Sequence, residues 1–191
     1  ANRQDNKSQK QKVYGFTVLC IFALGFWTLY NMEPSLISVF IKTNVDRHLF
    51  GLSLSADAFF GFEGTFIVIV GLFLTKLWLY LGKRNKDPSL AIKFGLALLF
   101  IGAGFIYLRY VIDLHGMTSK LPAIFILFAY FLFATGELFI GPLGISMVGK
   151  LSPEGFEGLF MGIWQLDIGI AAVLSGALAK LSVPPMGASF M

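Results

Sequence analysis

Charged side chains are scarce in this sequence. Asp, Glu, Lys and Arg make up 14% of its 191 residues, whereas a soluble domain carries roughly 25%. Apolar residues make up 56%, and the mean hydropathy is +0.74. These values exclude an ordinary soluble domain and predict an all-α integral membrane protein. The many Phe and Gly residues fit lipid-facing aromatics and close helix contacts.

Cysteine and histidine are nearly absent as well. The single cysteine, Cys20, excludes an intrachain disulfide. His48 and His115 lie in polar connections, without metal-ligand spacing to each other or to Cys20. The sequence also lacks the GxSxG, P-loop and GxGxxG motifs. We therefore expect neither a metal site nor enzymatic activity.

Long apolar runs fill most of the chain. About 20 apolar residues in a helix suffice to cross a bilayer. Segments of this kind lie at about residues 13–41, 58–81, 90–112, 121–148 and 159–178. Short polar connections separate them, so consecutive helices should be antiparallel neighbours. The sequence thus predicts one five-helix transmembrane bundle over residues 13–181, a polar linker at 1–12 and a truncated outer loop at 182–191.

Lys and Arg are unequally distributed between the two sides of this bundle. Most of them lie in residues 1–12, around residues 83–93 and at Lys150, all on one side. The positive-inside rule predicts that this side, with the N-terminal end, is cytoplasmic. The chain opens without a start methionine or a cleavable signal pattern. Together with the odd number of crossings, this indicates a segment of a longer polypeptide.

A single carboxylate, Glu137, lies in the middle of the fourth apolar segment. A charge at the bilayer centre costs about 2.5–3.5 kcal/mol on insertion scales, so this side chain should face protein or trapped water. One turn further on, Pro142 removes a helical hydrogen bond, so the helix should weaken or bend at Gly141 and Pro142. This pattern indicates a site in a bundle that changes shape. The alternative is a plain hydrogen bond from Glu137 to a neighbouring helix.

Further ionisable side chains lie within or near the spans. Glu33, followed by Pro34, and Glu63 lie in the outer halves of the first two segments, and Asp167 lies near the middle of the fifth. A set of carboxylates removed from water is typical of a proton-coupled site. The alternatives are solvated helix ends for Glu33 and Glu63 and an interhelical hydrogen bond for Asp167. Lys76 either snorkels to the interface or forms a gating salt bridge.

A family resemblance is visible in residues 136–179, GELFIGPLGISMVGKLSPEGFEGLFMGIWQLDIGIAAVLSGALA. This run resembles the tenth and eleventh helices of the proton-dependent oligopeptide transporter (POT) family of the major facilitator superfamily. Residues 81–105, LGKRNKDPSLAIKFGLALLFIGAGF, look like its connection from helix eight into helix nine, and residues 26–36, FWTLYNMEPSL, look like its seventh helix. The resemblance implies five helices, seven to eleven, of the six-helix C-terminal half of a twelve-helix transporter.

The resemblance also implies roles for individual residues. Glu137 falls where the family has a carboxylate that engages the peptide amino terminus and helps to couple protons. Trp164 falls at a cavity-lining aromatic position on helix eleven, and Pro142 falls at the kink of helix ten. Gly141 differs from the family, which usually has a cavity serine beside this proline.

Several acidic residues of this sequence stand at other positions than those of the family. Asn31 stands near a helix-seven position that is normally acidic, and Glu33 follows two residues later. Two residues correspond to about 200° around a helix, so Glu33 replaces that acid only if Pro34 distorts the turn. Glu63 falls where helix eight usually has Asn-Pro. Asp167 replaces a small or amide residue on helix eleven.

We therefore predict proton-coupled symport of di- and tripeptides, or of related small amino-bearing solutes, by alternating access. The implied partners are the lipid bilayer, the substrate and an N-terminal six-helix half, with no nucleic acid and with protons in place of any cofactor. The expected location is a plasma membrane, the bacterial inner membrane. A major-facilitator carrier of another solute or drug and a non-transporting half-carrier scaffold are the alternatives. The candidate substrate- and proton-binding residues are Glu137, Trp164, Asn31, Glu33, Glu63 and Asp167, and the candidate gating residues are Gly141, Pro142, Pro34 and Lys76.

Overall fold

The computed structural model describes residues 2–49, 51–115 and 120–182 of the chain. Its long helices are α1 (Asn2–Tyr30), α3 (Ala58–Lys83), α4 (Leu90–His115), α5 (Ala123–Leu151) and α6 (Glu157–Ser182). A π-helical turn, η1 (Glu33–Ile37), and a short helix, α2 (Ser38–Asn44), continue α1. The strands have two residues each and are β1 (Val45–Asp46), β2 (His48–Leu49), β3 (Leu52–Ser53) and β4 (Leu121–Pro122).

Within the described residues, five segments are long and apolar enough to cross a membrane. They are Gln9–Asn44, Ala58–Lys83, Leu90–His115, Ala123–Leu151 and Glu157–Leu181. The prediction of an all-α, multi-pass membrane bundle is confirmed. The first segment is the longest because α1, η1 and α2 follow one another in a single crossing. Most of the predicted outer loop, from residue 183 onward, lies outside the described residues.

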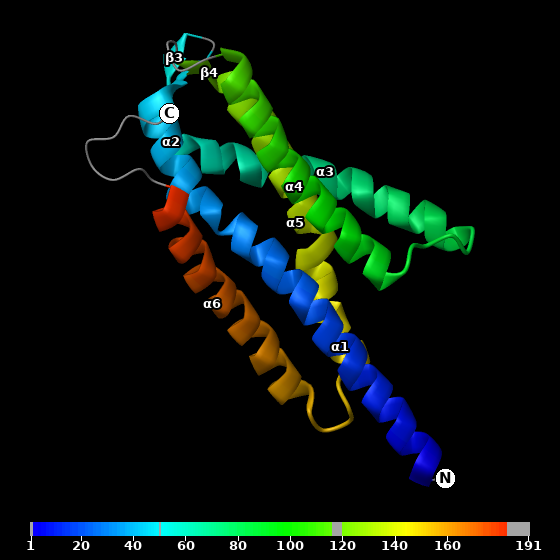
Figure 1. Cartoon of the computed structure of the whole chain (residues 1–191). Coiled ribbons are helices and arrows are strands. Elements are labelled where there is room, and N and C mark those ends of the chain that lie inside the picture. Colours follow the sequence, from blue (N-terminus) through cyan, green and yellow to red (C-terminus); the bar gives the residue numbers. More distant parts are fainter. Residues whose placement is uncertain (1, 50, 116–119, 183–191) are drawn as a thin grey trace.

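Helix α5 forms the centre of the bundle and packs against α1, α3, α4 and α6 (Figure 1). In its most apolar stretch 61% of the residues are buried, against 11–33% in the other spans. Glycines allow the closest approaches. A Cβ atom at Gly104 of α4 would lie 2.8 Å from Cδ1 of Phe133 on α5, and one at Gly136 of α5 would lie 3.1 Å from the carbonyl oxygen of Ala97. These contacts fix α4 tightly against α5.

The short strands lie at one end of the bundle, opposite the α5–α6 connection (Figure 1). Strand β1 pairs in parallel with β4, and β2 pairs antiparallel with β3. Gly51, at φ 81°, supports the turn between β2 and β3, because glycine adopts this left-handed backbone without strain. The sequence predicted only a polar turn in this region.

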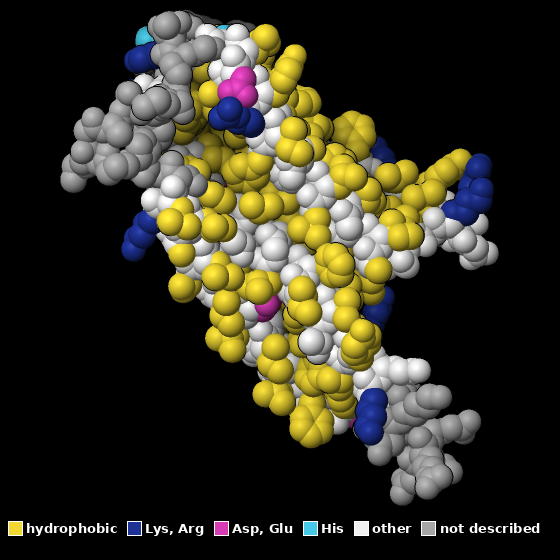
Figure 2. All heavy atoms as spheres, viewed as in Figure 1, with side chains coloured by type: hydrophobic (Ala, Val, Ile, Leu, Met, Phe, Trp, Pro, Cys, Tyr) yellow, Lys and Arg dark blue, Asp and Glu magenta, His cyan; other side chains and the backbone are white. Residues whose placement is uncertain are grey.

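Apolar side chains cover most of the visible face, and Lys and Arg gather near the ends (Figure 2). Lys93, at the start of α4, is an exception because it is buried. Its Nζ lies 2.8 Å from Oδ1 of Asp87 and 4.5 Å from the ring centroid of Trp78. This ion pair connects the α3–α4 turn to both helices.

Candidate functional site

Three glutamates from three elements meet in the interior of the bundle. Glu33 opens η1, Glu63 lies in the second turn of α3, and Glu137 lies in the middle of α5. The side chains of Glu33 and Glu63 are 2% and 7% exposed, and that of Glu137 is half-buried. The charges of all three carboxyl groups act on one another. The structure therefore brings together three of the residues predicted from the sequence.

Tyr30, the last residue of α1, connects Glu137 to this cluster. Its hydroxyl donates a hydrogen bond of 2.8 Å to Oε2 of Glu137 and also faces the carboxyl group of Glu63. The Tyr30 ring stacks on Phe26 with a centroid distance of 5.7 Å, which fixes its orientation. Tyr30 was not among the site residues predicted, because its contact with Glu137 joins positions 107 residues apart in the chain.

Tyr130 is the second tyrosine of the cluster. It is completely buried on α5, its hydroxyl faces Glu33, and its ring packs 6.4 Å from that of Phe59. The sequence contains a signal for this arrangement, since Tyr130, Phe133 and Glu137 recur at helical spacing on one face of α5.

The π-helical turn η1 explains why Glu33 points inward. Pro34 has no N–H group and cannot bond to the carbonyl oxygen of Tyr30, so the regular helix ends there. The backbone N–H of Ser38 bonds instead to the carbonyl oxygen of Glu33, five residues back. The side chain of Asn31 turns back onto its own helix and donates a 2.7 Å hydrogen bond to the carbonyl oxygen of Trp27. Pro34 thus distorts the turn, the condition under which Glu33 could take over from Asn31.

Several polar atoms of the cluster have unmet hydrogen-bonding capacity. Oε1 of Glu33, Oε1 of Glu63 and the hydroxyl of Tyr130 are buried, and none has a hydrogen-bond partner within the described part of the chain. Ionised carboxylates only accept hydrogen bonds, so Glu33 and Glu63 cannot bond to each other unless one of them carries a proton. Buried polar groups in this state indicate a place for a proton or another positive charge.

Trp164 and Asp167 of α6 lie apart from the glutamates. The Trp164 ring is 2% exposed and fits between Gly144 of α5 and Phe94 of α4, at a centroid distance of 6.5 Å from the latter. Asp167 is half-buried, and its charge acts on Cys20 of α1. Its buried Oδ2 has no hydrogen-bond partner among the described residues. A cavity-lining role for Trp164 and a proton-binding role for Asp167 stay predictions.

The candidate gating residues occupy exposed or lightly packed positions. Pro142 is exposed within α5, which runs as one helix from Ala123 to Leu151. A Cβ atom at Gly141 would meet no atom within 4 Å. Lys76 is exposed, and the described part of the chain offers it no ion pair. The gating roles of these residues also stay predictions.

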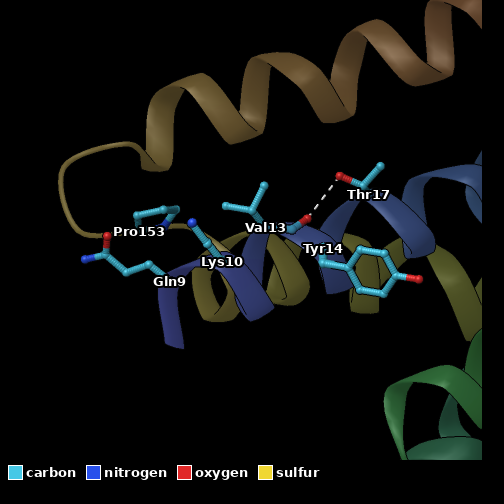
Figure 3. Close-up of a pocket in the computed structure, with 6 residues that line it drawn as sticks. All are labelled: Gln9, Lys10, Val13, Tyr14, Thr17 and Pro153. Atoms are coloured by element: carbon cyan, nitrogen blue, oxygen red, sulfur yellow. Dashed lines mark hydrogen bonds between the residues drawn. The ribbon is translucent and has the colours of Figure 1, made fainter. Parts of the chain in front are cut away.

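An open groove of about 450 Å³ lies at the end of the bundle away from the strands (Figure 3). The hydroxyl of Thr17, in its wall, donates a 3.0 Å hydrogen bond to the carbonyl oxygen of Val13 in its own helix. The groove contains none of the predicted site residues, so the glutamate–tyrosine cluster remains the candidate site. The residues that line the groove are Gln9, Lys10, Val13, Tyr14, Thr17 and Pro153.

Relatives of this chain are peptide permeases by name. The chain is 29% identical over 187 residues to a dipeptide and tripeptide permease B of Xenorhabdus bovienii and 28% identical over 191 residues to one of Yersinia enterocolitica. These alignments cover 96% and 98% of the chain but 38% of each relative. The chain therefore spans little more than a third of the length of these permeases.

Solved structures similar to this chain are also POT family transporters, and the chain again covers about a third of each. A peptide transporter POT in complex with sulfate superimposes with a TM-score of 0.85 and 26% identity, covering 93% of this chain and 35% of that one. A POT family transporter in complex with 5-aminolevulinic acid gives 0.83 and 28%, covering 91% and 36%. The predicted major-facilitator type of bundle is thereby confirmed. The sequence model described as the POT family matches residues 1–189, and the chain belongs to this family.

Proposed function

We propose that this chain forms part of a proton-coupled symporter of di- and tripeptides or related small amino-bearing solutes. One observation carries the proposal: Glu137, in the middle of a membrane-spanning helix, has Tyr30 as its hydrogen-bond partner and no ion pair with any described residue. A half-buried carboxylate of this kind is suited to bind a substrate ammonium group, which supplies the missing positive charge. The names of the permease relatives support a peptide substrate.

In this mechanism the Glu137 carboxyl group alternates between a substrate ammonium and a proton. The hydrogen bond from the Tyr30 hydroxyl orients this carboxyl group. Protons are the coupling ions, no further cofactor takes part, and the protein performs no enzymatic reaction. The cavity forms against an N-terminal six-helix half, and alternating access follows from movement of one half against the other.

The proposed location is a plasma membrane, the bacterial inner membrane. The N-terminal end of this chain and the α3–α4 and α5–α6 connections are placed on the cytoplasmic side. The unequal distribution of Lys and Arg supports this orientation. The strands β1–β4 then lie at the outer surface.

Transport in proteoliposomes tests the proposal. The full-length protein that contains this chain should accumulate a labelled dipeptide when the outside is more acidic than the lumen. Glu137→Gln should abolish this uphill uptake, because the amide neither binds an ammonium by charge nor exchanges a proton. Glu154→Gln, at an exposed position in the α5–α6 connection, is the matched control and should transport normally. Unchanged accumulation by Glu137→Gln would refute the role of this residue.

Competition experiments test the substrate class. Unlabelled di- and tripeptides should inhibit uptake of the labelled dipeptide, whereas free amino acids and cationic drugs should not. Inhibition by drugs alone, without dipeptide transport, would instead indicate a major-facilitator carrier of another solute.

A further inference from the structure

The Glu33 and Glu63 side chains form a close pair within this half of the molecule. Each is more than nine-tenths buried, and each has a buried Oε1 atom without a hydrogen-bond partner among the described residues. Their carboxyl groups lie close enough to form a hydrogen bond when one of them is protonated. All the elements that enclose them belong to this chain, so the pair does not depend on another half for its burial.

The side chains that face this pair are acidic or neutral. Tyr30 of α1 faces Glu63, Tyr130 of α5 faces Glu33, and the Glu137 charge acts on both. Helices α2 and α6 also pack on η1, and their Lys42 and Lys180 side chains are exposed. None of the ion pairs in the described part of the chain includes any of the three glutamates.

Two ionised carboxylates in this position would be unstable. Like charges a few ångströms apart repel each other strongly where water is excluded, and neither group can donate a hydrogen bond to the other. A single proton removes both problems, because the protonated carboxyl group donates to the ionised one. Paired carboxyl groups that share a site in this way hold one proton far more firmly than two. The described residues include no group of three or more ligands arranged for a metal ion.

We propose that Glu33 and Glu63 share one proton and form a coupling site separate from the substrate carboxylate Glu137. This inference rests on the proposed symport, which it deepens by naming where the coupling proton is held while the substrate ammonium occupies Glu137. Tyr30 connects the two sites, since its hydroxyl bonds to Glu137 and faces Glu63. When the shared proton leaves, the ionised Glu63 carboxylate lacks a hydrogen-bond donor. The Tyr30 hydroxyl then donates to Glu63 and leaves Glu137.

Transport measurements separate coupling from substrate binding. With one proton per substrate, a gradient of two pH units supports up to about 100-fold accumulation. Glu33→Gln and Glu63→Gln should each reduce this to no accumulation and retain counterflow, the exchange of labelled for unlabelled substrate across the membrane. Either amide can still donate to the remaining carboxylate, so the packing survives. Accumulation at the wild-type level in both variants would overturn the proposal.

Infrared difference spectroscopy of the full-length protein tests the sharing itself. A shared proton gives one pH-dependent carbonyl band of a protonated carboxyl group, which Glu33→Gln and Glu63→Gln each remove and Glu137→Gln leaves. Separate bands, one lost with each substitution, would overturn the proposal. This measurement needs no transport activity and decides the question even for a variant that is inactive.

Three results keep this inference distinct from the proposed function. No dipeptide accumulation by the wild-type protein refutes symport as such. Accumulation that is lost in Glu137→Gln but kept in both variants of the pair leaves symport intact and refutes the shared proton site. Tyr30→Phe should keep the infrared band of the pair but transport fewer protons per substrate. An unchanged proton-to-substrate ratio would remove Tyr30 from the coupling.

Discussion

The contact between Gly144 and Trp164 gives the sharpest stability prediction. A Cβ atom at Gly144 of α5 would lie 2.6 Å from Cη2 and 2.8 Å from Cε2 of the Trp164 ring, and closer still to Cζ2. The ring cannot easily yield, because it is 2% exposed and packs against Phe94 of α4 on another side. We expect Gly144→Ala to push α6 away from α5 or force the ring out of its favoured rotamer.

The size of the effect follows from two opposing contributions. Overpacking a filled site costs about 1–3 kcal/mol. Alanine favours the helix over glycine by about 0.5–1 kcal/mol. The net expectation for Gly144→Ala is a loss of roughly 1–2 kcal/mol. At about 2–4 °C per kcal/mol for a chain of this size, the melting temperature should fall by several degrees.

The assay is thermal unfolding of the purified protein in detergent, with Gly149→Ala as the matched control. Gly149 lies in the same helix, and a Cβ atom there would meet nothing within 4 Å, so this change should be neutral or stabilising. Trp164→Phe removes the overlapping ring atoms, and Gly144→Ala should therefore cost less in that background. A melting temperature for Gly144→Ala equal to or above that of Gly149→Ala would refute the reasoning.

Two further predictions concern the ends of the bundle. Asp87→Asn should destabilise the protein more than Lys93→Met does, by about 1–3 kcal/mol in unfolding free energy, because it leaves the buried Lys93 ammonium beside Trp78 without its charged partner. Equal melting temperatures of the two variants would contradict this. The pKa of Asp46 is lowered from 3.8, chiefly because the His48 side chain hydrogen-bonds its carboxylate. This contribution to stability is present above the ordinary pKa and is lost as the pH falls through the lowered one. In His48→Ala the Asp46 pKa should return toward its ordinary value, as measured by NMR of the side-chain carboxyl carbon, and an unchanged pKa would rule out the interaction.

The membrane spans were predictable from the sequence because hydropathy acts locally. Each span needs only its own run of apolar residues, and the cost of a charge in lipid requires Glu137 to face protein or water whichever helix lies beside it. The arrangement around Glu137 was not predictable in the same way. Its partner Tyr30 lies at the end of another helix, and nothing in the intervening residues determines that they meet.

The direction of Glu33 shows a second limit. In a regular helix the Glu33 side chain would point about 200° around the axis from that of Asn31. The backbone hydrogen bond lost at Pro34 changes this direction. The sequence reveals that a distortion can occur but not that the backbone forms a π-helical turn. The tight glycine contacts were equally hidden. Cβ atoms added at Gly158 and Gly162, which form a GxxxG pair, would meet no atom within 4 Å, whereas one added at Gly144 would overlap the Trp164 ring.

Different exposure of the glutamates separates two tasks. Glu137 is half-buried, whereas Glu33 and Glu63 are buried among the helices of this chain. In the proposed symporter, a substrate ammonium neutralises Glu137 and a proton neutralises the buried pair. A proton held there is shielded from competition with substrate, so occupancy of the two sites can differ during one cycle. In the proposed symporter the Tyr30 hydroxyl lies between these sites and makes each one sensitive to the charge of the other.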